Sequence, residues 1–251
     1  MKNILMTLSL LFAILIVGCK ENSVEPPLPN NYEPLMPISV GNYWLYQGYY
    51  LNSDGSVNSA DDYKFGFIID DTISQIINGN KILNYKLFNC GEELKPYYDK
   101  PGSFEGSKLI YQNKNGIFYA GDERYDTIKI TFNDLVFPYT VEKGKTVSGH
   151  VFYYSTLGNI SNVPSDVITD YICISTDSLF TTPLGDFQCI VYRMAYDDYK
   201  SLFRDEVNYF IKPGIGIVGM VQMIYFYNIG KYHYLNEYLL TNYKIKEEKL
   251  K

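Results

Sequence analysis

The stretch YKFGFIID, residues 63–70, alternates aromatic or aliphatic side chains with lysine, glycine and aspartate. Side chains of an extended chain point to opposite faces in turn, so this pattern predicts a strand with one buried face. The same period of two recurs in LNYKL, residues 83–87, and in TIKITF, residues 127–132. These three segments indicate a β-sheet with one side against a hydrophobic core.

Short turns separate the predicted strands. Residues 77–81, INGNK, contain an Asn-Gly pair, and residues 113–116 and 228–231 are similar in composition. These residues tolerate positive φ and favour hairpins between antiparallel neighbours. No amphipathic segment of three helical turns is present, although parallel strands would need such crossovers. We therefore predict an all-β fold with little helix: a single, strongly curved antiparallel meander of about ten or more strands, forming a half-barrel, a barrel or a sandwich.

Aromatic residues make up 16% of the chain, with 26 tyrosines and a single tryptophan, Trp44. Tyrosine favours strands and buries its ring while its hydroxyl stays hydrated, so a structural role explains most of them. The alternative is a ligand surface, because the pairs Tyr49-Tyr50 and Tyr153-Tyr154 place a ring on both faces of their strands.

The N-terminus has the features of a secretory signal: Met1-Lys2-Asn3, an apolar run over residues 4–17, and a small residue, Gly18, before Cys19. The run is shorter than the roughly 20 apolar residues of a spanning helix, which disfavours an uncleaved anchor. Residues 16–19, IVGC, resemble the lipobox of bacterial lipoproteins. That resemblance implies cleavage after residue 18, lipidation (palmitate among the acyl groups) at Cys19, and a lipid-anchored protein of the bacterial cell envelope, periplasmic or surface-exposed.

The segment after Cys19 is rich in proline and lacks apolar periodicity. Its prolines are Pro26, Pro27, Pro29, Pro34 and Pro37. Such chain favours extended polyproline II, so we predict a tether over residues 19–37. The composition then stays uniform to the C-terminus, which predicts one β-rich domain over residues 38–251.

The charge balance argues against nucleic acid as a partner. Lysine and arginine number 22 against 28 acidic residues, giving a formal net charge of −6. Nucleic-acid binding depends on clustered basic side chains, and the sequence contains no basic cluster.

No catalytic or cofactor motif is present in the sequence. The two histidines, His150 and His233, have neither HExxH nor paired-ligand spacing, and nucleotide-binding glycine loops are missing. We predict a protein that is not an enzyme and has no cofactor. Acidic pairs at residues 61–62, 70–71 and 197–198 keep an acid-catalysed hydrolase as an alternative, because glycoside hydrolysis uses two carboxylates; solvated loops explain these pairs better.

Three cysteines follow Cys19, at Cys90, Cys173 and Cys189, without CxxC spacing. An exported protein meets oxidising conditions, so one disulfide or none is consistent with this count. Cys173 and Cys189 lie on predicted strands close in sequence and are the candidate disulfide pair.

Residues 52–61 resemble the calcium loop of dockerins. Such loops take oxygen ligands at alternate positions and a glycine at the sixth. Asn52, Asp54, Asn58 and Asp61 fall at the third, fifth, ninth and twelfth positions, but Tyr50 stands at the first, where a carboxylate is required. The residues after the loop alternate like a strand, so our prediction is a polar hairpin without a metal.

Three further segments resemble elements of uncharacterised bacterial envelope lipoproteins: GNYWLY (residues 41–46), TPLGDFQC (182–189) and KPGIGIV (212–218). The resemblance implies GNxWxY, TPxGxF and PGxGxV elements in that order on a curved β-sheet. Proline and glycine there suit tight turns, so we interpret these as fold positions. The strand-rich pattern is also similar to the half-barrel of periplasmic lipoprotein carriers.

Three functions remain open from the sequence. We rank first a non-catalytic binding or structural module of the envelope, with an apolar small molecule on a concave sheet as its ligand. A surface lipoprotein that binds a glycan or an envelope protein comes second, and the hydrolase third. An apolar cavity, an exposed aromatic patch or two converging carboxylates would distinguish them.

Overall fold

The computed structural model describes residues 34–77, 79–95, 107–124, 127–139, 142–150, 168–197 and 203–246. The lipobox, Cys19 and the tether up to residue 33 lie outside these ranges. No helix within the described ranges has the length and hydropathy to span a membrane.

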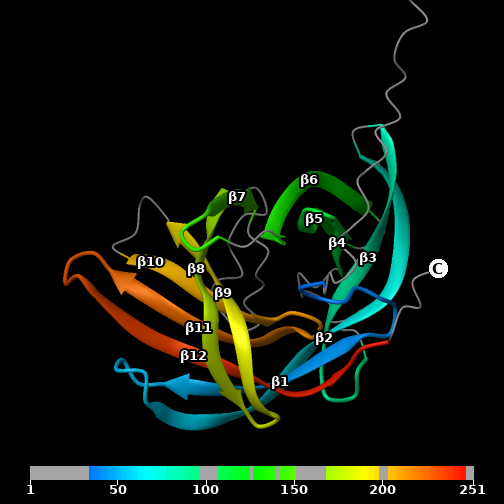
Figure 1. Ribbon diagram of the computed structural model, residues 1–251. Coiled ribbons are helices and arrows are strands. Elements are labelled where there is room, and N and C mark those ends of the chain that lie inside the picture. Colours follow the sequence, from blue (N-terminus) through cyan, green and yellow to red (C-terminus); the bar gives the residue numbers. More distant parts are fainter. Residues whose placement is uncertain are drawn as a thin grey trace, which may run out of the picture. The chain divides into compact units, whose positions relative to one another are not determined.

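The described residues form one antiparallel sheet of twelve strands (Figure 1). The strands are β1 (Tyr43–Leu51), β2 (Val57–Ile77), β3 (Asn80–Cys90), β4 (Ser107–Asn113), β5 (Gly116–Arg124), β6 (Thr127–Pro138), β7 (Thr146–His150), β8 (Ile168–Thr182), β9 (Gly185–Asp197), β10 (Phe203–Lys212), β11 (Gly216–Phe226) and β12 (Lys231–Lys244). The predicted all-β antiparallel meander is confirmed.

The sheet consists of two meanders that meet in its middle. β1 to β6 follow one another outward on one side, and β7 to β12 do so on the other, with β1 paired to β12. The three predicted Asn- and Gly-rich turns join β2 to β3, β4 to β5 and β11 to β12. The sequence pattern could place these hairpins, but the β1–β12 pairing joins segments about 190 residues apart.

Strong curvature closes the sheet almost into a barrel. The strands at the two ends of the order, β6 and β7, lie beside each other. Phe137 of β6 packs its ring against Tyr171, Tyr192 and Tyr209, with 6.0, 5.5 and 5.5 Å between ring centroids. The Tyr192 hydroxyl also donates a hydrogen bond to the carbonyl of Pro138 at 2.7 Å. We call the side that carries these rings the inner face of the sheet.

The inner face is filled by large buried side chains. Trp44 and Tyr46 of β1 are 0% exposed. Trp44 donates through Nε1 to the carbonyl of Ile215 at 2.6 Å, and the Tyr46 hydroxyl donates to that of Ile217 at 2.8 Å. Because the N–H and O–H groups of these rings donate to backbone carbonyls, both rings can be buried without leaving a donor unpaired. The side chains of the inner face therefore form the hydrophobic core of the domain.

The packed domain begins before the predicted boundary at residue 38. The backbone of Gly214, in the β10–β11 turn, donates to the carbonyl of Pro34 at 2.7 Å. Leu35 and Met36, assigned to the tether by composition, are both only 3% exposed and belong to the core. Gly216 accommodates Met36: a Cβ there would lie 3.0 Å from Met36 Cγ, and its φ of +108° favours glycine.

The opposite side of the sheet, the outer face, is partly covered by the β8–β9 hairpin. This hairpin crosses β10, β11 and β12 in Figure 1, and β8 contacts both β11 and β12. Phe180 near its tip stacks on Phe210 and lies directly over Gly219. Because the hairpin covers part of the outer face, some residues of that face are also buried.

Candidate functional site

The most distinctive polar feature of the described residues is a cluster on the outer face. It comprises Arg193 (β9), Arg204 and Glu206 (β10), Tyr225 (β11) and Tyr232 (β12), and we call it the arginine–tyrosine cluster. The strand register brings them together, because Arg204 lies opposite Tyr225, which in turn lies opposite Tyr232. Alternation along β10 places Arg204 and Glu206 on one face and the core residues on the other.

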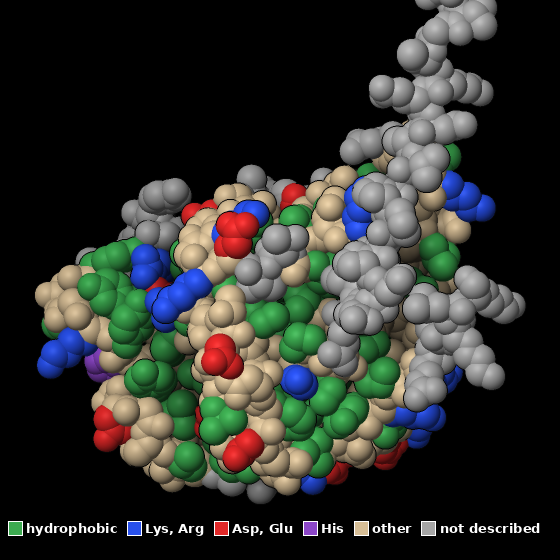
Figure 2. Space-filling view, viewed as in Figure 1, with side chains coloured by type: hydrophobic (Ala, Val, Ile, Leu, Met, Phe, Trp, Pro, Cys, Tyr) green, Lys and Arg blue, Asp and Glu red, His purple; other side chains and the backbone are tan. Residues whose placement is uncertain are grey.

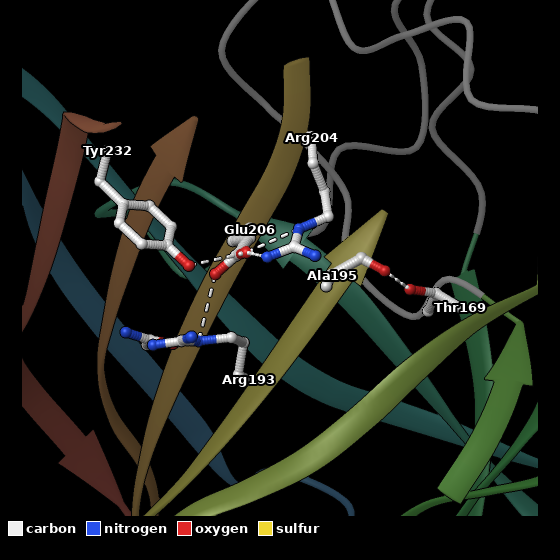
Figure 3. Close-up of polar contacts among 7 residues, drawn as sticks. Thr169, Arg193, Ala195, Arg204, Glu206 and Tyr232 are labelled. Atoms are coloured by element: carbon white, nitrogen blue, oxygen red, sulfur yellow. Dashed lines mark hydrogen bonds and ion pairs between the residues drawn. The ribbon is translucent and has the colours of Figure 1, made fainter. Parts of the chain in front are cut away.

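Glu206 is the centre of the cluster and is 0% exposed (Figure 3). Its Oε1 accepts hydrogen bonds from Arg204, through Nε at 2.8 Å and through Nη2, and from the Tyr232 hydroxyl at 3.2 Å. Its Oε2 lies 3.2 Å from Arg193 Nε. A fully buried carboxylate would be very unfavourable without such partners.

Arg193 contacts Glu206 differently from Arg204. Its Nε–H donates to Asn208 Oδ1 at 3.1 Å, so the contact with Glu206 Oε2 is an ion pair without an aligned hydrogen bond. Consistently, Glu206 Oε2 has no hydrogen-bond partner among the described residues. Arg204 therefore provides the hydrogen bonds, and Arg193 adds a second positive charge.

The two guanidinium groups also lie against the tyrosine rings. Arg193 Cζ is 5.8 Å from the Tyr232 centroid and Arg204 Cζ is 5.5 Å from that of Tyr225. The two rings are 4.9 Å apart, and Tyr227 continues the series at 5.6 Å from Tyr225. Arginine over an aromatic face is a favourable cation–π contact. The rings remain partly exposed, so they flank the arginines at the surface.

The charges in the cluster do not cancel. Desolvation disfavours the charged form of Arg204, but the Glu206 carboxylate outweighs it and the pKa of Arg204 is raised. Arg193 and Arg204 are 29% and 31% exposed, against one buried carboxylate. Within the cluster itself, two guanidinium groups therefore face a single carboxylate.

The acidic residues considered as a hydrolytic pair are placed only in part by the structure. Asp205 lies next to Glu206 in sequence but on the opposite face of β10. Burial raises the pKa of Asp205 to about 6. Asp70 and Asp71 lie in β2, where Asp71 contacts Lys86 at 3.6 Å, while Asp198 and the side chains of residues 61, 62 and 197 lie outside the described part.

The candidate calcium loop is the turn between β1 and β2. The Asp54 carboxylate accepts hydrogen bonds from the Ser56 amide at 2.9 Å and from the Ser56 hydroxyl at 2.6 Å. These bonds lower the pKa of Asp54. Asn52 donates to the Ser56 hydroxyl at 2.9 Å, and Asn58 is exposed on β2. Within the described residues, no three His, Cys, Asp or Glu side chains are grouped as metal ligands.

The candidate disulfide between Cys173 and Cys189 does not form in the structure. Cys173 lies opposite Tyr192 on the inner face, whereas Cys189, three residues from Tyr192 along β9, faces the other side. Three residues span roughly 10 Å of strand, beyond the Cα separation that a disulfide bridges. Both are buried free thiols, as is Cys90.

The histidines do not form a site with other ligands in the described residues. His233 lies on β12 and packs edge-on against Phe226, with 4.9 Å between ring centroids. His150 ends β7, and its side chain is outside the described part.

The three sequence elements interpreted as fold positions hold turns and termini together. In the first, Asn42 donates to the carbonyl of Pro37 at 2.9 Å and accepts from the Lys246 amide at 2.8 Å. In the second, the Leu184 amide donates to the Thr182 hydroxyl at 3.1 Å within the β8–β9 turn. The third forms the β10–β11 turn that accommodates Met36 and Trp44. Each element has a structural role of this kind.

Sequence reasoning missed the arginine–tyrosine cluster, although one signal was present. Arg204 and Glu206 are two charged residues spaced by two in a strand, so they share one face, opposite to Val207 and Tyr209. Alternation predicts that such a face is exposed. The burial of Glu206 depends instead on strands β9 to β12 meeting around it, which no local pattern shows.

Comparisons with known proteins give structural similarity at a low level. No family model matches the sequence, and no curated protein matches it. A crystal structure of a candidate lipoprotein from Parabacteroides distasonis is 12% identical, covering 86% of this chain and 100% of that one, with a TM-score of 0.40. An exported protein with a YmcC-like fold from Bacteroides fragilis is also 12% identical, covering 85% of this chain and 100% of that one, with a TM-score of 0.42. Neither similarity carries a conclusion about function.

Proposed function

We propose that this chain is a lipid-anchored protein of the bacterial cell envelope whose β-domain binds a ligand on its outer face without catalysing a reaction. Residues 1–19 support the lipid anchor, because a short apolar run there leads into the lipobox-like IVGC. Several acyl chains, each contributing about 0.8 kcal/mol per buried CH₂, would hold the protein at a membrane.

The observation that carries the binding function is the arginine–tyrosine cluster. It combines guanidinium groups that are about one-third exposed with partly exposed aromatic rings, while the charge at its centre is buried. Binding surfaces are enriched in tyrosine and arginine because both give large contact area and directed hydrogen bonds.

An apolar ligand on the concave face is less well supported. Trp44 and Tyr46 are fully buried there, and Tyr192, Tyr209 and Tyr238 are 1% exposed. A ligand would have to displace a packed aromatic core, which costs several kcal/mol per large side chain. The structure therefore favours the glycan-binding or protein-binding alternative, which uses surface residues.

The face shown in Figure 2 has acidic and basic side chains scattered among apolar ones, without a broad field of one charge. Recognition on such a face would depend on local groups rather than on a broad charged field. A polymer that is held by charge alone would need a more extensive basic surface.

Two experiments test the proposal. Fractionation of cells that express wild-type or Cys19→Ala chain should show the protein in membranes only when Cys19 is present, with incorporation of labelled palmitate. The full chain, purified in a polyoxyethylene detergent, is then passed over immobilised neutral and acidic polysaccharides. Retention on at least one, reduced by Tyr227→Ala but not by Ile76→Ala, supports a glycan-binding domain; Ile76 is an exposed apolar residue of β2 and serves as the control. Retention on none would contradict it.

A further inference from the structure

Arg193 and Arg204 have separate roles. They differ in which of their nitrogen atoms donate hydrogen bonds. Arg204 uses Nε and Nη2 on Glu206 Oε1. Arg193 uses only Nε, which contacts Asn208 and Glu206. Among the described residues, neither Nη atom of Arg193 has a hydrogen-bond partner, and its side chain is 29% exposed.

The Nε side of Arg193 is fixed by its neighbours. Asn208 accepts its hydrogen bond, Glu206 lies 3.2 Å away, and the Tyr232 ring lies under the guanidinium plane at 5.8 Å. A guanidinium held in this way loses little entropy when its free edge binds an anion. The Nη1–Nη2 edge matches two oxygens of a carboxylate, sulfate or phosphate group, because the planar fork donates two parallel hydrogen bonds.

The charge balance agrees with this assignment. One arginine is sufficient to neutralise Glu206, and Arg204 makes the hydrogen bonds that do so. Arg193 makes no aligned hydrogen bond to Glu206, so its guanidinium group can donate to a bound anion without breaking one to this carboxylate.

The tyrosine rings beside the two arginines indicate which kind of molecule would carry the anionic group. Tyr225 and Tyr232 are partly exposed, and Tyr227 is 45% exposed. Their faces are apolar and their hydroxyls are polar, which suits a sugar ring with C–H groups on its face and hydroxyls at its edge. An acidic peptide would satisfy Arg193 but would make less use of a row of three rings.

We propose that the arginine–tyrosine cluster, together with the neighbouring Tyr227, binds an acidic polysaccharide. Arg193 Nη1 and Nη2 donate to its anionic group, and Tyr225, Tyr227 and Tyr232 contact its sugar rings. This deepens the proposed function and rests on it. Arg204 and Glu206 are positioning residues, because they hold the cluster together from below the surface.

The test measures dissociation constants for the full chain in a polyoxyethylene detergent. The probes are polygalacturonate, which carries carboxylates, dextran sulfate, which carries sulfates, neutral dextran, and poly-L-glutamate. We expect one of the two acidic polysaccharides to bind more tightly than dextran and poly-L-glutamate, and the identity of the better one to report which anionic group is recognised. Binding should weaken with added salt, since the contact is charge-assisted.

Substitutions of Arg193 separate the contribution of its charge to binding from that of its paired Nη donors. Arg193→Ala should weaken binding about ten- to a hundredfold, the range for a lost charge-assisted contact. Arg193→Lys should recover only part of it, because an ammonium lacks the paired edge. Lys231→Ala removes a neighbouring exposed charge on β12 and should leave the affinity within about twofold. Circular dichroism melts check that each variant is folded, and Arg193→Gln replaces Arg193→Ala if the latter is not.

Three results would overturn this proposal. Unchanged affinity in folded Arg193→Ala and Arg193→Gln would exclude Arg193 as the contact. Binding of poly-L-glutamate at least as tight as that of both polysaccharides would assign the cluster to an acidic peptide. If no acidic probe binds but a neutral polysaccharide is retained, the proposed glycan-binding function stands and the anionic assignment fails.

Discussion

Phe180 of β8 stacks on Phe210 of β10, with 4.0 Å between ring centroids and 22° between ring planes. The space for this contact comes from Gly219 on β11. A Cβ built on Gly219 would lie 2.0 Å from Phe180 Cε1, so the Phe180 ring would have to move to make room for it. The close stacking of Phe180 over β11 therefore requires that residue 219 has no side chain.

We predict that Gly219→Ala lowers the free energy of unfolding by about 1–3 kcal/mol, the usual cost of overpacking. Chemical denaturation followed by the fluorescence of Trp44, the single tryptophan, measures it. In a Phe180→Leu background the same substitution should cost less, because the clashing ring atoms are gone. An equal loss of unfolding free energy in the two backgrounds would show that the contact with Phe180 is not the reason why residue 219 must be glycine.

Arg204 should matter more for stability than Arg193. Arg204→Ala leaves the fully buried Glu206 without its principal donors and should cost about 3 kcal/mol. Arg193→Ala removes an ion pair without an aligned hydrogen bond and should cost about 1 kcal/mol. Urea denaturation of both variants gives the comparison. A larger loss for Arg193→Ala would reverse the roles that we assign to the two arginines.

The buried thiols should be unreactive in the folded protein. Burial raises the pKa of Cys90 to about 12 and that of Cys189 to about 11, and it also raises that of Cys173. A raised pKa leaves little thiolate near pH 8, and thiolate is the reactive species. Cys19→Ala chain treated with Ellman's reagent should show almost no reaction when folded and three thiols in guanidinium chloride. A count of one thiol after denaturation would demonstrate a disulfide.

Asp205 should make stability depend on pH. Its pKa is about 6 in the folded chain, because burial disfavours the carboxylate, and about 3.9 in an unfolded one. Between these values the folded state binds more protons, so the free energy of unfolding falls as the pH rises. Asp205→Asn should therefore raise Tm at pH 7 and have little effect below about pH 4. The exposed Glu142→Gln is the control, and an equal gain at every pH would argue against burial as the cause.

The β1–β2 turn should not bind calcium. Asp54 is already hydrogen-bonded to Ser56, and Tyr50 occupies the position of the first carboxylate. Calorimetry with millimolar calcium should give no resolvable heat and no rise in Tm. A saturable signal that Asp54→Ala removes would establish a cation site in this turn.

The local pattern was sufficient to predict the strands and hairpins, because alternation and Asn-Gly turns act over a few residues. It could not predict that Leu35 and Met36 belong to the core, since their burial depends on the β10–β11 turn about 180 residues later. Cys173 and Cys189 illustrate the same limit. They are close in sequence, but the register and the irregularities of β8 place them on opposite faces.

The site was harder to predict than the fold. Glu206 is charged and lies on the face opposite to Tyr209, so alternation assigns it to solvent. Its burial comes from neighbours on three other strands, and these neighbours are distributed between residues 193 and 232. Only the sheet order brings them together.

The place where the chain joins its domain has a mechanical consequence. A pull on Pro34 is transmitted through Leu35 and Met36 into β1, which lies between β2 and β12 and is hydrogen-bonded to both. Force along a central strand is shared by many backbone hydrogen bonds at once, whereas force on an edge strand opens them one by one. A pull on Pro34 should therefore load β1 along its length, against the backbone hydrogen bonds on both of its sides.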